Sequence, residues 1–185
     1  MEQPKTHFKN LVDSTTADWK VIDKSYEPIR STQGKRLLDT LRGLKFIQGA
    51  LPIDRFEHSL QAATRAHSDG RSDEYVFTVL LHDIGAYLTM HNHAEVSASI
   101  LKAYVSPELY WMILHHDDFE AFHYFDKIGL SPNLRDQYEG HPNYAMTEEF
   151  CRLYDSPSWD SAFQSKPLEF FLPIVERIIL TGKLK

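Results

Sequence analysis

Apolar residues recur every three or four positions along most of the chain, the spacing that places them on one face of an α-helix. This pattern predicts helices over residues 33–48, 54–67, 72–81, 92–101, 106–116, 143–155 and 167–180. Residues 129–140, which begin and end with glycine, are predicted to form a loop with at most one helical turn. Alternation of apolar and polar residues, the mark of a half-buried strand, is missing from the sequence. The predicted fold is therefore an all-α helical bundle.

Polar residues with capping chemistry stand at the start of these predicted helices. The spacing of a capping box is found twice, in Asp54 with Glu57 and in Asn92 with Glu95. Further start signals are Ser72, and Ser106 followed by Pro107. Residues 1–32 carry only scattered apolar anchors, so we expect an irregular N-terminal arm or lid there and one helical core with the metal site over residues 33–185.

Composition and charge narrow the class of protein. The chain has 185 residues, of which 42% are hydrophobic and 25% charged, and this suits one soluble globular domain. The net charge of -6 disfavours nucleic acid and anionic membrane surfaces as partners. A single cysteine excludes a disulfide framework, and no apolar run is long enough to span a membrane. We therefore expect a cytoplasmic protein, and the oligomeric state is left open.

Histidines gather in the middle of the chain, where they indicate a metal site. Eight of the ten histidines lie between His58 and His123. The apolar residues 79–81 lead directly to His82 and Asp83, and burying an imidazole beside a carboxylate is costly unless each has a strong partner such as a metal ion. Such ligands suit iron, manganese or zinc. The candidate ligands in chain order are His58, His82, Asp83, His91 or His93, His115 or His116, and Asp155.

Neighbouring residues compete for some of these positions. His93 is favoured over His91 because it opens a predicted helix. Asp155 is favoured over Asp160, although either carboxylate could instead cap a helix end. Four histidines and two aspartates exceed the needs of one ion, whereas two ions bridged by Asp83 would use all six ligands. Residues predicted to orient ligands or touch substrate are His91, His115, His123 and Arg65.

The order His58, His82-Asp83, Asp155 resembles the H…HD…D signature of the HD-domain superfamily. Within it, residues 56–61 (FEHSLQ) and 80–85 (LLHDIG) are similar to the mixed-valent diiron oxygenases, which include the inositol and hydroxyphosphonate oxygenases. The segment beginning at His93 resembles the third-histidine segment of those enzymes. In the same comparison His116 resembles the fourth histidine and Asp155 the closing aspartate.

This resemblance implies an HD-type helical bundle that holds two iron ions in a mixed Fe(II)/Fe(III) state. The implied ligands are His58, His82, Asp83, His93, His116 and Asp155, with His82 and Asp83 central to catalysis. The implied partners are dioxygen and a small hydroxylated organic substrate, which the enzyme would cleave oxidatively.

Two positions depart from the oxygenase pattern. Ala86 replaces a basic residue that follows the HD pair in the oxygenases, and Glu120 replaces a lysine found in the phosphonate branch. Both changes remove a group expected to meet an anion, so a less charged hydroxylated molecule is the expected substrate.

Two other functions stay open. One is a phosphohydrolase with manganese or another divalent metal, acting on a nucleotide or other phosphate ester. A phosphate ester normally needs Lys or Arg side chains to stabilise its developing negative charge. Few lie near the motif, and the nearest candidates are Arg65 and Lys102, so this function is disfavoured. The other is a metal-stabilised binding module without catalytic activity.

Overall fold

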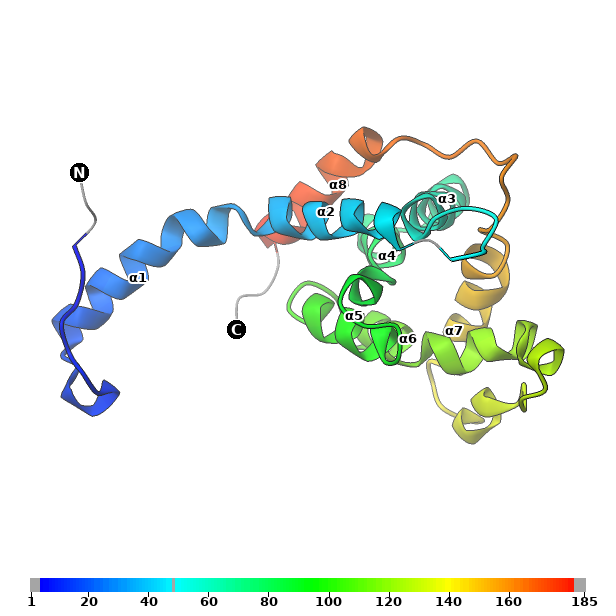
Figure 1. Cartoon of the computed structure of the whole chain (residues 1–185), viewed down its shortest axis with the longest axis horizontal. Helices are drawn as coiled ribbons and strands as arrows, with labels where there is room; N and C mark the ends of the chain where they lie inside the picture. Colours follow the sequence, from blue (N-terminus) through cyan, green and yellow to red (C-terminus); the bar gives the residue numbers. More distant parts are fainter. Residues whose placement is uncertain (1–3, 48, 182–185) are drawn as a thin grey trace.

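The computed structural model describes residues 4–47 and 49–181, and its regular elements there are all helical (Figure 1). The α-helices are α1 (Thr16–Ser31), α2 (Gln33–Gly43), α3 (Arg55–Ser68), α4 (Asp73–Leu80), α5 (His93–Leu101), α6 (Pro107–Glu120), α7 (Tyr144–Phe150) and α8 (Leu168–Thr181). The predicted all-α fold is confirmed.

Short 3-10 turns and one π-helical turn join the α-helices. They are η1 (Leu11–Asp13), η2 (Leu44–Phe46), η3 (Ile84–Tyr87), η4 (Ala121–His123), η5 (Phe125–Ile128), η6 (Leu134–Tyr138) and the π-helical η7 (Cys151–Asp155). The helix predicted over residues 33–48 is shorter than expected, because α2 ends at Gly43 and continues as η2; residue 48 lies outside the described residues. The predicted loop at 129–140 contains only η6.

Three of the predicted N-caps form, but neither of the two predicted capping boxes is complete. The side chains of Ser72 and Ser106 accept hydrogen bonds from backbone N–H groups in the first turns of α4 and α6. Asp54 likewise accepts from the backbone N–H of Glu57 at 2.8 Å, while the Glu57 carboxylate accepts instead from the Ser165 hydroxyl at 2.8 Å. Asn92 does precede α5, but its side chain makes no capping bond, so the capping box predicted there is wrong.

The helices form two layers on either side of the central α4. In Figure 1, α2, α3 and α8 lie on one side of α4, and α5, α6 and α7 lie on the other. The contacts between the layers bury apolar side chains almost completely, among them Phe77, Leu80, Met112, Phe150 and Phe171. Because α4 is short and surrounded, the turn that follows it delivers His82 and Asp83 to the middle of the bundle.

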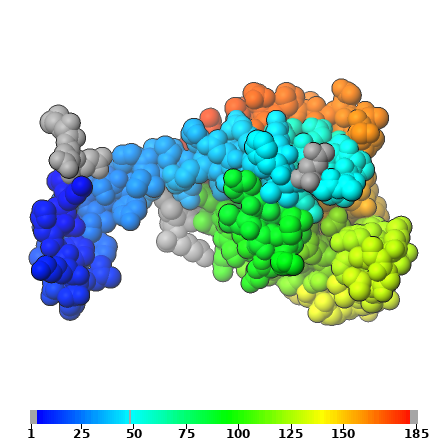
Figure 2. All heavy atoms as spheres, in the orientation of Figure 1, coloured from blue at the N-terminus to red at the C-terminus, as the bar shows by residue number. Residues whose placement is uncertain are grey.

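The N-terminal region is more regular than the sequence pattern suggested. Thr15 and Asp18 form a reciprocal capping box, and α1 then runs for 16 residues. The expectation of an irregular segment is wrong here because the anchors Trp19, Ile22 and Tyr26 do have helical spacing. No residue of α1 is buried, and the helix extends away from the body as a narrow arm (Figures 1 and 2). The division into an arm or lid over 1–32 and a core over 33–185 stays a prediction; residues 1–3 and 182–185 lie outside the described residues.

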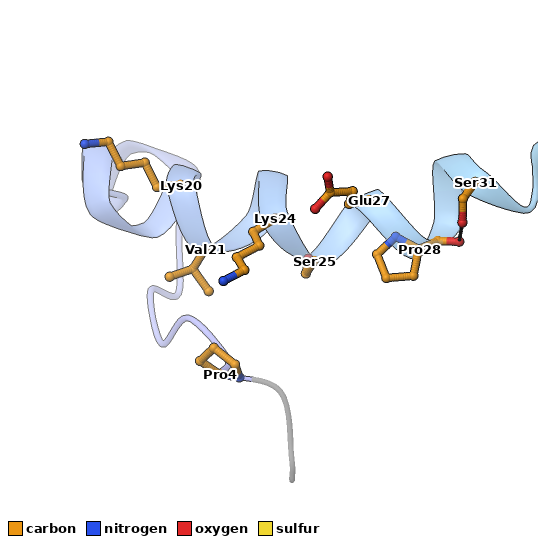
Figure 3. A pocket seen from close by; sticks show the side chains of 8 residues that line it. All are labelled: Pro4, Lys20, Val21, Lys24, Ser25, Glu27, Pro28 and Ser31. Carbon is orange, nitrogen blue, oxygen red and sulfur yellow. Dashed lines mark hydrogen bonds between the residues drawn. The ribbon is translucent and has the colours of Figure 1, made fainter. Parts of the chain in front are cut away.

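A groove of about 840 Å³ lies between the segment at Pro4 and α1 (Figure 3). Its lining is formed by Pro4, Lys20, Val21, Lys24, Ser25, Glu27, Pro28 and Ser31. None of these residues is a candidate metal ligand. Over the described residues, no helix is both long and apolar enough to cross a membrane.

Candidate metal centre

The six predicted ligands come together from five separate parts of the fold. His58 lies in α3, His82 and Asp83 in the turn after α4, His93 at the first position of α5, His116 in α6, and Asp155 at the end of η7. All six residues are buried. Because α3, α4, α5, α6 and η7 pack against one another, residues far apart in the sequence meet at one point inside the bundle.

We call His58, His82 and Asp155 the inner half of the centre. The Nε2 atom of His58 lies 3.2 Å from Nε2 of His82 and 3.1 Å from Oδ1 of Asp155. The Nε2 atom of His82 lies 3.5 Å from the same Asp155 oxygen. Three donor atoms at these separations could bind one ion between them.

We call His93, His116 and Asp117 the outer half of the centre. Oδ1 of Asp117 lies 3.1 Å from Nε2 of His93 and 3.6 Å from Nε2 of His116. Asp117 was not among the ligands predicted from the sequence, because a run of acidic residues is usually exposed to solvent. The feature of the sequence that could have identified Asp117 as a candidate ligand is its position directly after His116.

Asp83 lies between the two halves and is close to both. Its Oδ1 atom is 2.9 Å from Nε2 of His93 and 3.6 Å from Nε2 of His116 in the outer half. The same oxygen is 3.7 Å from Nε2 of His82, and Oδ2 is 4.0 Å from Nε2 of His58 in the inner half. This is the arrangement that a carboxylate shared by two ions requires.

The hydrogen bonds of the histidine rings suit metal binding. The Nδ1 atoms of His58, His82 and His116 lie 2.9, 2.7 and 2.7 Å from the backbone carbonyl oxygens of Ser158, Val79 and Ile113, respectively. Since a carbonyl only accepts, Nδ1 of each ring carries a proton, which leaves Nε2 as the nitrogen that could bind a metal ion.

Several side-chain atoms of the candidate ligands are buried and form no hydrogen bond. They are both ring nitrogens of His93, of which only one can bind a given ion, Nε2 of His116 and Oδ2 of Asp155. Leaving polar atoms buried and unpaired costs free energy, unless a ligand satisfies them. The buried and unpaired nitrogens and oxygen therefore fit a bound metal ion.

The local backbone explains how these side chains are aimed. Gly85 follows the HD pair, and a Cβ at this position would lie 2.3 Å from the carbonyl oxygen of His93. The backbone N–H of Gly85 also donates to the Ser97 hydroxyl at 2.9 Å, which ties the turn to α5. At the other end, Asp155 completes the π-helical turn η7, a distortion that is frequent at functional sites.

Arg55 and Trp159 flank the inner half and were missed from the sequence. The Arg55 guanidinium, largely buried, forms an ion pair and hydrogen bond with Asp83. The Trp159 ring stacks on His58 with 4.0 Å between ring centroids. A signal for Arg55 existed, because it precedes His58 by three residues and so lies on the same face of α3.

The surrounding charges hold the central carboxylates ionised. Burial alone would raise the pKa of Asp83, but His82 and Arg55 outweigh it, and this pKa lies well below its ordinary value. Burial is likewise outweighed at Asp155, whose pKa is lowered by hydrogen bonding to His58 and His82. Ionised carboxylates are the form that binds a cation.

The carboxylates in turn affect the groups on α6. Burial alone would lower the pKa of His116, but Asp117, Asp83 and Asp155 raise it to about 10. The pKa of Glu120 is raised to about 8 by burial and by the negative charges of Asp155 and Asp83. Glu120 follows His116 by one helical turn, so the residue that departs from the oxygenase pattern lies beside the centre.

The competing candidates are separated by their positions. His93 is buried while His91 is exposed, and His116 is buried while the ring of His115 packs against Trp111 and Tyr138.

Over the described part of the chain, the other residues expected to orient ligands or touch substrate form no hydrogen bond or ion pair with the metal ligands. Arg65 donates a hydrogen bond at 3.1 Å to the carbonyl of Pro157, beside the Ser158 carbonyl that faces His58. His123 is half-buried, and burial together with Arg135 lowers its pKa. The roles of His91, His115, His123 and Arg65 toward ligands or substrate stay predictions.

Comparison with known protein families gives one match. The family model described as the HD domain matches residues 55–148, just over half of the chain. No curated protein matches the chain. The match includes His58, His82, Asp83, His93 and His116 but ends before Asp155, which is linked to the centre by its contacts with His58 and His82.

Proposed function

The chain belongs to the HD-domain family, a family of metal-dependent enzymes that bind divalent ions. Within this family, we propose that it is a diiron oxygenase. The proposed ligands are His58, His82, Asp155 and Asp83 for one ion, and His93, His116 and the shared Asp83 for the other. The proposed reaction is oxidative cleavage of a small hydroxylated substrate by dioxygen.

The position of Asp83 carries this proposal. Its two oxygens face histidines of both halves at 2.9 to 4.0 Å, so one carboxylate can serve two ions. Four imidazoles with carboxylates form a ligand set that suits iron. Two bound iron ions would supply the Lewis-acid and redox chemistry by which dioxygen oxidises a hydroxylated carbon.

The charges around the centre support a substrate that carries no strong negative charge. Asp117 adds a carboxylate to those of Asp83 and Asp155, whereas Glu120, whose pKa is raised to about 8, adds a carboxyl group that is mostly uncharged near neutral pH. Among the described residues, the arginine that lies beside the centre is Arg55, and it is already paired with Asp83. An anionic substrate would meet these carboxylates, whereas a neutral hydroxylated molecule would form hydrogen bonds with them.

Arg55 also supports a second candidate, the metal-dependent phosphohydrolase that is typical of the family. The sequence offered Arg65 and Lys102 as the nearest cations, but Arg65 contacts Pro157 and Lys102 lies over the Tyr110 ring. Arg55 instead lies beside Asp83, where its charge could stabilise a phosphate ester. This candidate would use manganese or another divalent ion.

One set of assays separates the two functions. The protein is reconstituted anaerobically with Fe(II), and metal content, oxygen consumption and product formation are measured over a panel of small diols, amino alcohols and hydroxy acids. The oxygenase proposal expects about two ions per chain and substrate-dependent oxygen uptake. The Asp83→Asn variant, which retains the size of the side chain, is the inactive control.

The second arm of the assay uses a nucleotide panel with Mn²⁺ and measures phosphate release. Phosphate release together with one ion per chain would contradict the oxygenase and support the hydrolase. If the parent protein binds metal but turns over neither panel, the metal-stabilised binding module becomes the better interpretation.

A further inference from the structure

We propose that Asp117 is a seventh metal ligand, which binds the outer ion and gives way when substrate binds. The inference rests on the proposed dinuclear centre and assigns a residue outside its six ligands. With Asp117 included, each ion has two histidines, one carboxylate of its own and a share of Asp83. The two halves then differ mainly in how far their own carboxylate is exposed.

The distances place Asp117 on the same two nitrogens that Asp83 faces. Oδ1 of Asp117 is 3.1 Å from Nε2 of His93 and 3.6 Å from Nε2 of His116. Oδ1 of Asp83 is 2.9 and 3.6 Å from those two atoms. Ligand atoms about 2.1 Å from one ion lie roughly 3.0 to 3.5 Å from one another, so these four nitrogen–oxygen distances are close to those within a coordination shell.

The Nε2 imidazole nitrogens of the outer half have no hydrogen-bond partner. The Nε2 atoms of His93 and His116 are buried, and neither forms a hydrogen bond, although two carboxylate oxygens lie within 3.6 Å of each. A cation between these two nitrogens and the carboxylate oxygens of Asp83 and Asp117 would satisfy all four atoms.

Exposure distinguishes Asp117 from the other two carboxylates. Its side chain is 40% exposed, whereas those of Asp83 and Asp155 are 2% exposed. Asp117 is therefore the carboxylate of the centre that an incoming molecule meets first. Because exchange of a partly solvated ligand requires little rearrangement of the core, substrate is expected to displace Asp117 and bind at the outer ion.

The neighbouring Asp118 provides a matched control. Its carboxylate accepts a hydrogen bond at 2.7 Å from the hydroxyl of Tyr138 and has no measured contact with the histidines of the centre. Asp117→Asn and Asp118→Asn thus make the same chemical change at adjacent, partly exposed positions of α6.

The test measures metal affinity with Mn²⁺ as the probe, by competition against a chelator and by metal content per chain. For Asp117→Asn and Asp117→Ala we expect the weaker-binding ion to lose at least about tenfold in affinity, while the tighter ion is unchanged. Asp118→Asn should retain both affinities, and Asp117→Glu should recover part of the loss. Circular dichroism and thermal unfolding establish that each variant is folded.

The outcomes separate the failure of this inference from that of the proposed function. A parent with two ions and unchanged affinities in Asp117→Ala would overturn the role of Asp117 and leave the dinuclear centre in place. An equal loss in Asp118→Asn would also overturn it, because the effect would then be one of surface charge. A parent with a single ion would overturn the dinuclear function and the inference with it.

Discussion

The inner and outer halves of the centre have similar donors but different surroundings. In the inner half, both histidines are bonded through Nδ1 to backbone carbonyls, and His58 is covered by the Trp159 ring. In the outer half, Nδ1 of His93 has no hydrogen bond, and Asp117 is partly exposed. Fixed, buried ligands hold an ion firmly, whereas unfixed and exposed ones allow exchange. The comparison suggests a permanent inner ion and an outer ion that meets substrate.

The largest effect is expected from Asp83→Asn, which removes the one ligand that the halves share. An amide oxygen binds cations poorly, and Arg55 would lose the carboxylate that it pairs with. Metal content should fall from about two ions per chain to near zero, as measured by elemental analysis after gel filtration. If both ions remain, Asp83 does not bridge them and the two halves are independent.

Histidine substitutions should separate the halves. His116→Ala removes an outer ligand and should leave about one ion per chain in the inner half. His58→Ala removes an inner ligand and should lead to loss of the inner ion. It should in addition destabilise the metal-free protein by about 1–3 kcal/mol, because it opens a cavity beneath Trp159. Chemical denaturation of both variants in chelator measures the second effect. If both variants destabilise the metal-free protein equally, the inner histidines are not held more firmly by their surroundings than the outer ones.

Gly85→Ala should weaken metal binding in the outer half, although it changes no ligand side chain. The added Cβ would lie 2.3 Å from the carbonyl oxygen of His93 and 2.9 Å from the backbone nitrogen of Ser97, so the start of α5 must move. We expect a loss of about 1–3 kcal/mol in stability and weaker binding of the outer ion. Gly49→Ala is the matched control, because nothing lies within 4 Å of its added Cβ. Comparable losses in both variants would show that steric contact at α5 is not the cause.

The smallest effect is expected from Tyr154→Phe, next to the inner ligand Asp155. The Tyr154 hydroxyl accepts from Arg71 at 2.8 Å and donates to Asp69 at 3.1 Å, which links η7 to the end of α3. Losing these bonds should cost about 1 kcal/mol of stability, with a slight loss of inner-ion affinity and none at the outer ion. Thermal unfolding with and without metal provides the measurement, and a selective loss of the outer ion would contradict it.

Local rules predicted the fold well because they act over a few residues. Ser72 and Ser106 begin helices as expected, since a cap needs only the N–H groups of the next turn. The same rules failed where a distant partner intervenes. The Glu57 carboxylate contacts Ser165 rather than closing a capping box, and nothing in residues 54–60 announces that contact.

The candidate ligands could be named from the sequence because their residue types and order are distinctive. His58, His82, Asp83 and Asp155 carry the H…HD…D pattern, and the bundle gathers them as predicted. Burial then separated His93 from His91 and His116 from His115, choices that such close positions leave nearly equal in sequence.

The sequence by itself determined the helical bundle, its principal caps and the set of candidates that contains the six converging residues, because these follow from periodicity and from the chemistry of single side chains. Only the tertiary structure decided that Arg55 rather than Arg65 lies beside Asp83, and that Asp117 lies beside His93 and His116. The physical reason is that contacts across α3, α5 and α6 depend on how the helices are rotated and packed. A charged residue at a helix end has the same local pattern whether it faces water or a metal centre.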